Sequence, residues 1–136
     1  MTAEPIWFTD RFILPLHARL IREFGGLEGL RDVNLLESAL RHPIDKWNYQ
    51  KPEPDLSEMA AAYIWGIVRN HPFVDGNKRT AYVVFRSFLM MNGWYLSATQ
   101  DEKYDVTHGI AAGNYSEIEV SEWIRFFMVK IDGGQL

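Results

Sequence analysis

The side chains best suited to chemistry lie within nine consecutive residues, 71–79. His71 is suited to accepting a proton, because imidazole titrates near neutral pH. Lys78 and Arg79 place two positive charges where a helix is predicted to start, and the unpaired N–H groups of a first helical turn also attract phosphate. Asp75 would repel a phosphate there unless a Mg²⁺ ion bridged the two. A base, a metal carboxylate and a phosphate cradle predict transfer of a phosphoryl or nucleotidyl group to a hydroxyl.

The backbone of this segment is predicted to turn sharply ahead of the helix. Pro72 disfavours helical geometry at His71, which should therefore be extended or in a turn. Gly76 permits a tight bend and Asn77 starts the helix, so both would cradle phosphate through backbone and amide groups. Phe73 is predicted to point into the core and to fix the direction of the loop. The alternative is an ordinary Asp-Gly turn with an Asn cap and two surface cations, which leaves the adjoining His-Pro-Phe corner unexplained.

Residues 71–79 match the pattern His-x-Phe-x-Asp-Gly-Asn-x-Arg, which resembles the signature of the Fic/Doc family. Lys78 in the variable position and the Thr-Ala pair that follows the motif resemble the death-on-curing branch. Residues 29–32 and 35–40, Gly-Leu-Arg-Asp and Leu-Leu-Glu-Ser-Ala-Leu, are also similar to that branch. The resemblance implies an all-α Fic fold and a toxin that uses ATP and Mg²⁺ to modify a Ser or Thr of a protein. It also implies elongation factor Tu as the target.

Two reactions are compatible with this resemblance, and positions 78 and 82 distinguish them. Most Fic proteins transfer AMP and resemble Gly-Asn-Gly-Arg-x-x-Arg, in which a second glycine and a second arginine accommodate the phosphates. Here these positions hold Lys78 and Tyr82. Lys78 fills the space that the second glycine would leave open, and Tyr82 cannot supply the positive charge of the second arginine. Phosphoryl transfer is therefore favoured over nucleotidyl transfer. The expected roles are general base for His71, Mg²⁺ ligand for Asp75, and binding of ATP phosphates by Gly76, Asn77, Lys78 and Arg79.

The resemblance also indicates how such an enzyme would be restrained. Many Fic proteins carry an inhibitory helix with Ser/Thr-x-x-x-Glu, whose glutamate pairs with the second arginine of the motif. In this sequence no Ser or Thr is followed four residues later by Glu, and Tyr82 replaces that arginine. The death-on-curing resemblance therefore implies inhibition by a separate small antitoxin that folds on binding. A catalytically idle module that only binds a partner is a third possibility.

Composition predicts a single domain, residues 1–136. With 47% hydrophobic residues, a chain of 136 residues can bury one core. The absence of cysteine excludes disulfides and thiolate metal sites. The net charge of -4 argues against direct binding of nucleic acid. No signal-like segment begins the sequence and no apolar run approaches about 18 residues, which predicts a cytoplasmic protein without membrane association.

Six helices are predicted to position the motif. They cover residues 11–24, 32–41, 56–69 and 77–91, a segment from 99 to 113, and a last one that starts at 116 and ends before Gly133 and Gly134. Pro15 requires a later start or a kink in the first helix. The helix at 77–91 is apolar nearly all round, which predicts that it is central and buried.

Several residues outside the motif have expected roles that are less specific. Pro43 is predicted to end the second helix, and residues 42–55 to form a flap-like loop. In that loop, Trp47 and Tyr49 either contact the substrate or cover the core. His17 and His108 are expected to pack or to face solvent, because no chemical partner lies near them in sequence. Arg86, about 10.5 Å along the helix from Arg79, is expected to snorkel or to pair.

Overall fold

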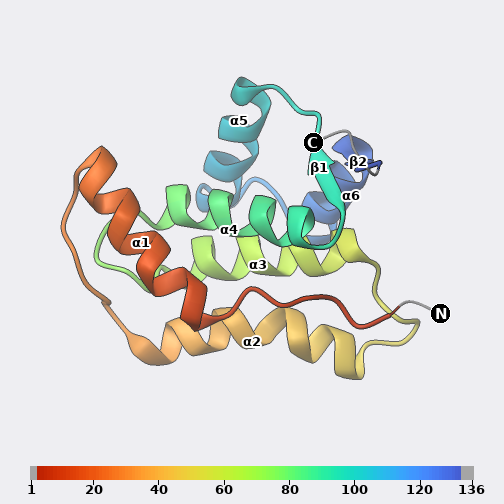
Figure 1. Cartoon of the computed structure of the whole chain (residues 1–136), viewed down its shortest axis with the longest axis horizontal. Coiled ribbons are helices and arrows are strands. Elements are labelled where there is room, and N and C mark those ends of the chain that lie inside the picture. Colours follow the sequence, from red (N-terminus) through yellow and green to blue (C-terminus); the bar gives the residue numbers. More distant parts are fainter. Residues whose placement is uncertain (1–2, 133–136) are drawn as a thin grey trace.

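The structure, a computed structural model, describes residues 3–132 and is mainly helical (Figure 1). It confirms the predicted all-α class and adds a small antiparallel sheet that was not predicted. No helix in the described range is long and apolar enough to span a bilayer. The elements in chain order are α1 (Asp10–Phe24), α2 (Val33–Tyr49), α3 (Leu56–Asn70), α4 (Asn77–Met91), β1 (Trp94–Leu96), α5 (Gln100–Ala111), α6 (Glu117–Phe127) and β2 (Met128–Lys130).

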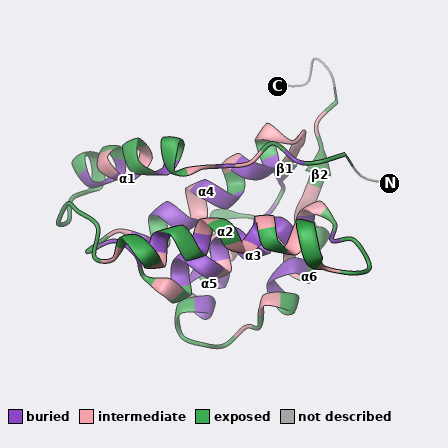
Figure 2. Ribbon diagram, turned by 90° about the horizontal axis from the view of Figure 1, so that it is seen from below, coloured by how far each residue is buried: buried purple, intermediate pink, exposed green. Residues whose placement is uncertain are grey.

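Helices α3 and α4 run side by side through the middle of the molecule (Figure 1). Figure 2 shows that the buried residues concentrate there, whereas α1 and α2 turn many exposed residues outward. α4 has the predicted bounds, but it was expected to be apolar nearly all round and it exposes Lys78, Arg79, Arg86 and Met90. In α3 only Arg69 is exposed, because α3 packs against α2, α4, α5 and α6. α3 is therefore the more deeply buried of the two.

α2 is longer than predicted, because Pro43 does not end it. The helix continues to Tyr49 with Pro43 inside and buried. Proline removes one backbone N–H from the helix, which tertiary packing can offset. That packing is close: a Cβ atom on Gly66 of α3 would lie 3.3 Å from the Cα of Ala39. The predicted flap-like loop at 42–55 is thus wrong over its first half.

The second half of α2 is also tied to α6. Glu117 Oε1 lies 2.7 Å from His42 Nε2, and Glu117 Oε2 lies 2.7 Å from Lys46 Nζ. Burial raises the pKa of Glu117, but the hydrogen bonds and charges of His42 and Lys46 outweigh it, so the pKa lies below its ordinary value. These contacts, far from the motif in sequence, help to keep the chain helical beyond Pro43.

α1 begins at Asp10, one residue before the predicted start. Its buried side chains share one face at helical spacing: Ile13, His17, Leu20 and Ile21. Pro15 lies inside the helix on the exposed side. A later start, one of the two predicted ways to accommodate Pro15, is therefore wrong.

Both C-terminal helices begin with the predicted caps. Thr99 and Glu102 form a capping box at α5, and Ser116 and Glu119 form one at α6. α6 ends at Phe127, where the chain continues as β2. The predicted stop at Gly133 and Gly134 lies outside the described residues.

Strands β1 and β2 pair antiparallel in a register that places Tyr95 opposite Val129. The turn that leads into β1 has the predicted residues, with Gly93 at φ 91° after α4. Both strands have only three residues, too few to show the alternation by which strands are predicted. The sheet was therefore missed.

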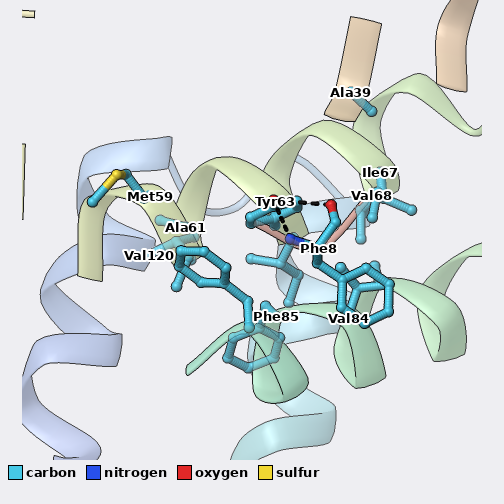
Figure 3. Close-up of a cluster of buried hydrophobic side chains, with 14 of the residues drawn as sticks. Phe8, Ala39, Met59, Ala61, Tyr63, Ile67, Val68, Val84, Phe85 and Val120 are labelled. Atoms are coloured by element: carbon cyan, nitrogen blue, oxygen red, sulfur yellow. Dashed lines mark hydrogen bonds between the residues drawn. The ribbon is translucent and has the colours of Figure 1, made fainter. Parts of the chain in front are cut away.

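The N-terminal segment is fastened to the core by a buried tyrosine (Figure 3). The Tyr63 hydroxyl donates to the Phe8 carbonyl oxygen (3.0 Å) and accepts from the Phe8 N–H (2.9 Å). Tyr63 has no exposed surface, and burial raises its pKa. Because a buried hydroxyl without partners is costly, this pair of bonds favours one position for the chain ahead of α1.

Candidate active site

The motif forms the corner between α3 and α4. His71 follows α3 in the left-handed conformation (φ 53°, ψ 56°), and its N–H donates to the Ile67 carbonyl oxygen at 3.1 Å. Within residues 3–132 it is the one non-glycine residue with positive φ. Such a conformation is costly for most residues and persists where surrounding contacts impose it. Of the two predicted geometries, extended or turn, His71 adopts a turn.

Arg31 holds this corner in place. Its Nε donates to the His71 carbonyl oxygen at 2.7 Å, and its Nη2 donates to the Asn70 carbonyl oxygen at 2.8 Å. The His71 side chain is exposed, and no group in the described part of the chain hydrogen-bonds to its imidazole. The backbone of His71 is therefore fixed while its ring is free to react.

Phe73 supports the loop from inside, as predicted. Only 1% of Phe73 is exposed, and its ring stacks on that of His17, with 3.8 Å between centroids and 7° between planes. His17 Nε2 lies 2.8 Å from the Asp75 carbonyl oxygen. Since a carbonyl only accepts, that nitrogen carries the hydrogen. His17 packs, as expected, but it packs on the motif.

Asn77 closes the loop on itself. Its side-chain oxygen accepts from the Phe73 N–H and its side-chain nitrogen donates to the Phe73 carbonyl oxygen, both at 2.9 Å. Asn77 is buried, so these bonds occupy the amide that was expected to hold phosphate. Its contribution to the cradle is therefore confined to its backbone.

The start of α4 carries the groups expected to bind phosphate. Gly76 caps the helix with φ 75° and makes no side-chain cap, so the N–H groups of the first turn remain available to a ligand. Lys78 and Arg79 are exposed beside them. The Arg79 guanidinium lies 4.3 Å from the ring centroid of Phe24, a cation–π contact that orients it.

Asp75 lies at the same corner. Its Oδ1 accepts from the Gly76 N–H at 3.0 Å, and its Oδ2 accepts from the Leu27 N–H at 3.1 Å. A Cβ atom on Gly26 would come within 2.9 Å of Oδ2, so glycine suits that position. Each carboxylate oxygen has a second lone pair, which leaves Asp75 able to bind a cation.

Residues 25–32 form the loop that lies against the motif, a role not predicted for them. Leu30 forms a β-bridge with Phe73, and the Val74 N–H donates to the Gly29 carbonyl oxygen at 3.0 Å. The N–H groups of Arg31 and Asp32 both donate to the Pro72 carbonyl oxygen. This segment, and not the predicted one at 42–55, is the loop that pairs with the motif.

Neither aromatic residue of the predicted flap lies near the motif. Trp47 packs against the core, and Tyr49 is 78% exposed. α2 starts beside the motif, so at 1.5 Å per residue Tyr49 lies about 24 Å along the helix from Val33. Trp47 therefore covers the core, and the alternative of a substrate contact is not supported for either ring.

A pocket of about 550 Å³ opens at the motif. One wall brings together six predicted site residues, namely His71, Asp75, Gly76, Asn77, Lys78 and Arg79. The opposite wall, which was not predicted, is formed by Gln100, Lys103, Tyr104, Thr107, His108 and Ala111 of α5. His108 therefore belongs to the pocket, although its sequence neighbours gave no reason to place it there.

Tyr82 stands between the two walls. Arg86 lies over its ring, 5.7 Å from the centroid, and Lys103 Nζ of α5 lies 5.9 Å from it. Arg86 thus pairs, as expected, and its partner is an aromatic ring. Position 82, where the common Fic pattern has its second arginine, is therefore flanked by the positive charges of Arg86 and Lys103.

Residues 7–89 match the model of the Fic/DOC family. The chain belongs to the Fic/Doc family. It is 41% identical over 78 residues to "Toxin Doc" of Mycolicibacterium smegmatis, a match that covers 57% of this chain and 60% of that protein. It is 33% identical over 113 residues to "Protein kinase doc" of Escherichia phage P1, covering 83% of this chain and 88% of that protein. Within the Fic/Doc family it therefore resembles the death-on-curing toxins, as the motif predicted.

The matched range contains the whole motif wall, together with Arg31 and His17. The α5 wall lies beyond residue 89 and outside the matched family model. Sequence reasoning found the motif wall because its residues are consecutive. It missed Arg31 and His17, which are 40 and 58 residues away from the atoms they bind.

Proposed function

We propose that this Fic/Doc protein transfers the γ-phosphoryl group of ATP to a Ser or Thr hydroxyl of a protein target. One observation carries the proposal: the imidazole of His71, which has no hydrogen-bond partner in the described residues, and the uncapped start of α4 open into the same pocket. The similarity to a protein named as a kinase supports phosphoryl transfer. The reaction would take place in the cytoplasm.

The motif suggests how the residues divide this work. His71 would take the proton from the attacking hydroxyl as its oxygen bonds to the γ-phosphorus and the bond to the leaving ADP breaks. Lys78 and Arg79 would neutralise charge on the transferred group, and the N–H groups that follow Gly76 would cradle it. The exposed, unbonded His71 ring and the oriented Arg79 fit these roles.

Asp75 is the residue that would hold Mg²⁺. No group of three or more His, Cys, Asp or Glu that could bind a metal exists among the described residues. A single carboxylate fits magnesium in ATP enzymes, where phosphate oxygens and water complete the shell. When bound, the ion would supply charge neutralisation between the terminal phosphates.

Nucleotidyl transfer is the alternative reaction. It would need the α-phosphate at the position where His71 activates the hydroxyl, with the outer phosphates held beyond it. Lys78 occupies the place where most Fic proteins have a glycine, and it lines the pocket. Its four-carbon side chain narrows that space, which favours binding of the terminal phosphate at the cradle.

The loop at residues 25–32 is the segment suited to hold the target. It pairs with the motif through Leu30 and Gly29, and exposed apolar side chains lie on both sides of this pairing: Leu27 and Leu30 of the loop and Val74 of the motif. A flap that aligns the target segment is what the family resemblance implies. We assign this role to residues 25–32 in place of 42–55.

We further propose that the chain is the toxin of a toxin–antitoxin pair that modifies elongation factor Tu and arrests translation. Relatives named "Toxin Doc" and "Protein kinase doc" support a toxin of this kind. A small antitoxin would bury apolar surface as its tail folds on the toxin, which gives a negative heat-capacity change on binding. Expressed alone, the chain should stop bacterial growth, and His71→Ala or the antitoxin should restore it.

Labelled ATP tests the activity and the target together. Purified protein with Mg²⁺ is added to a bacterial lysate with either γ-labelled or α-labelled ATP. The proposal expects one protein band labelled from the γ position, and none with His71→Ala. If wild-type protein binds no nucleotide in calorimetry and labels nothing, the chain is an idle binding module.

A further inference from the structure

Three groups from α1 and the turn that follows it converge on Asp75. His17 Nε2 lies 2.8 Å from the Asp75 carbonyl oxygen, and the Leu27 N–H donates to Asp75 Oδ2 at 3.1 Å. The third group is the backbone of Gly26, because a Cβ atom there would come within 2.9 Å of Oδ2. One helix and its turn therefore hold both the main chain and the carboxylate of the same residue.

The side chain of His17 is itself held in one orientation. It is 4% exposed, and its ring lies flat on that of Phe73. Nε2 carries the hydrogen, because a carbonyl oxygen only accepts. A Cβ atom on Gly76 would lie 3.7 Å from the same nitrogen. The ring thus borders the motif from Phe73 to the residue that caps α4.

The turn after α1 contains two glycines that differ in one respect. Gly25 has φ 87° and Gly26 has φ 117°, and both values favour glycine. A Cβ atom on Gly25 would meet no described atom within 4 Å. One on Gly26 would meet the Asp75 carboxylate as well as the end of the Ile21 side chain. Close approach of the backbone to the carboxylate therefore depends on Gly26 and not on Gly25.

We propose that His17 and the turn at Gly26 and Leu27 are positioning groups for Asp75, and that they set how strongly Mg²⁺ supports the binding of ATP. This rests on the proposed function, in which Asp75 holds the ion. Mg²⁺ demands near-ideal octahedral geometry with oxygens at about 2.0–2.1 Å, so displacing a carboxylate ligand weakens its binding. Among the described residues that line the pocket, Asp75 is the one carboxylate, so no neighbour compensates for its displacement.

A purely structural role for these contacts predicts a different pattern. If they only stabilised the fold, their loss would weaken ATP binding to the same extent with and without Mg²⁺. If they position Asp75, the loss appears only in the part of the affinity that depends on Mg²⁺. Binding without the metal is retained, because the N–H groups of α4 with Lys78 and Arg79 meet the phosphates directly.

Calorimetry on the full chain, with ATP and either Mg²⁺ or EDTA, measures the gain in ATP affinity that Mg²⁺ provides. Wild type should show such a gain, and Asp75→Asn should remove most of it. Gly26→Ala should reduce the gain by roughly tenfold, the lower end of the usual contribution of groups that orient a metal ligand.

Gly25→Ala is the matched control for Gly26→Ala. It introduces the same kind of backbone strain without a contact to Asp75, so it should keep the wild-type gain. Binding of ATP needs no protein target, so the role proposed for residues 25–32 does not enter this comparison.

Two variants of His17 repeat the test at the carbonyl oxygen. His17→Phe keeps a ring against Phe73 and loses the N–H donor, so the Mg²⁺ gain should fall severalfold. His17→Gln loses the ring but can place an amide N–H near the position of Nε2, so it should keep more of the gain. If packing alone mattered, the phenylalanine would be the milder change. Melting curves by circular dichroism report on the stability of both variants separately.

The outcomes separate this inference from the proposed function. If Gly26→Ala and His17→Phe keep the wild-type Mg²⁺ gain, α1 does not position Asp75 and the proposed transfer can still hold. Equal losses in Gly25→Ala and Gly26→Ala would overturn the inference in the same way, as would a gain that is absent from wild type or survives Asp75→Asn. If wild type binds ATP neither with nor without Mg²⁺, the proposed function fails too.

Discussion

The two walls of the pocket are built in different ways. The motif wall is a short irregular segment whose backbone is fixed by side chains from other elements, such as Arg31 at His71 and His17 at Asp75. The α5 wall is a regular helix, and the side-chain hydrogen bonds of its pocket residues stay within it, from His108 to the Tyr104 carbonyl oxygen and from Thr107 to the Lys103 carbonyl oxygen. An irregular backbone requires outside support, whereas a helix positions its side chains through its own repeat.

This difference separates the two kinds of mutation that would impair the protein. Changes to the supports of the motif wall should lower the rate of transfer, because the reacting group must be placed accurately. Changes on the α5 wall should lower nucleotide affinity. The predictions that follow test the motif wall and its supports in order of decreasing effect.

Removing the imidazole should have the largest effect. His71→Ala is expected to lower the transfer rate by about 10²- to 10⁴-fold, the usual contribution of a general base. Alanine is disfavoured at φ 53°, so His71→Gly, which suits that backbone, is the companion variant. Both should show this loss of rate and remain folded by circular dichroism. A rate close to that of wild type in either variant would exclude His71 as the base.

Removing the support of that backbone should come next. Arg31→Ala loses the bonds to the His71 and Asn70 carbonyl oxygens and should lower kcat by roughly 10- to 100-fold. KM for ATP should change little, because the phosphate cradle does not include Arg31. Steady-state kinetics with labelled ATP measures both. Arg41→Ala, an exposed arginine of α2, is the control and should match wild type.

Substitution of two equally buried phenylalanines distinguishes a residue that supports the motif from one that contributes only to the stability of the fold. Phe73→Leu and Phe88→Leu should each lower the free energy of unfolding by about 1–2 kcal/mol, since both rings are buried. Only Phe73→Leu should also lower kcat, by roughly tenfold, because its ring stacks on His17 beneath the motif. Urea unfolding and kinetics on both variants give the comparison. Equal kcat values would mean that Phe73 acts through stability alone.

A smaller effect is expected at His17. His17→Phe keeps a ring against Phe73 but loses the hydrogen bond to the Asp75 carbonyl oxygen, which should cost about 1 kcal/mol in the free energy of unfolding. His17→Ala should cost more, because it also loses the stacked ring. Chemical denaturation of both proteins measures the difference. If they are equally stable, the stack contributes nothing.

The smallest effect on activity is expected far from the pocket. Glu117→Gln should leave kcat unchanged and lower stability by about 1 kcal/mol at neutral pH, since it removes the charge facing His42 and Lys46. The pKa of Glu117 is held below its ordinary 4.5, so its stabilisation is present above that pH and is lost as pH falls further. Melting curves from pH 7 to pH 3 should therefore converge for the two proteins. Glu122→Gln, exposed on α6, should follow wild type throughout.

The sequence was informative where a signal is local. The bounds of α4, the capping boxes of α5 and α6, and the buried position of Phe73 follow from neighbouring residues. The length of α2 could not be predicted in this way, because what carries it past Pro43 is packing on α3 and the contacts of His42 and Lys46 with Glu117 of α6. The same holds for the α5 wall, whose His108 has a chemical context only once the helix faces the motif.

The most direct test of the account is the intact mass of the modified target. The target labelled in the lysate is purified, incubated with wild-type protein, ATP and Mg²⁺, and weighed by mass spectrometry. The account predicts an increase of one phosphate with wild type and no increase with His71→Ala. An increase of a whole AMP would contradict phosphoryl transfer, and modification by His71→Ala at the wild-type rate would contradict the role of His71.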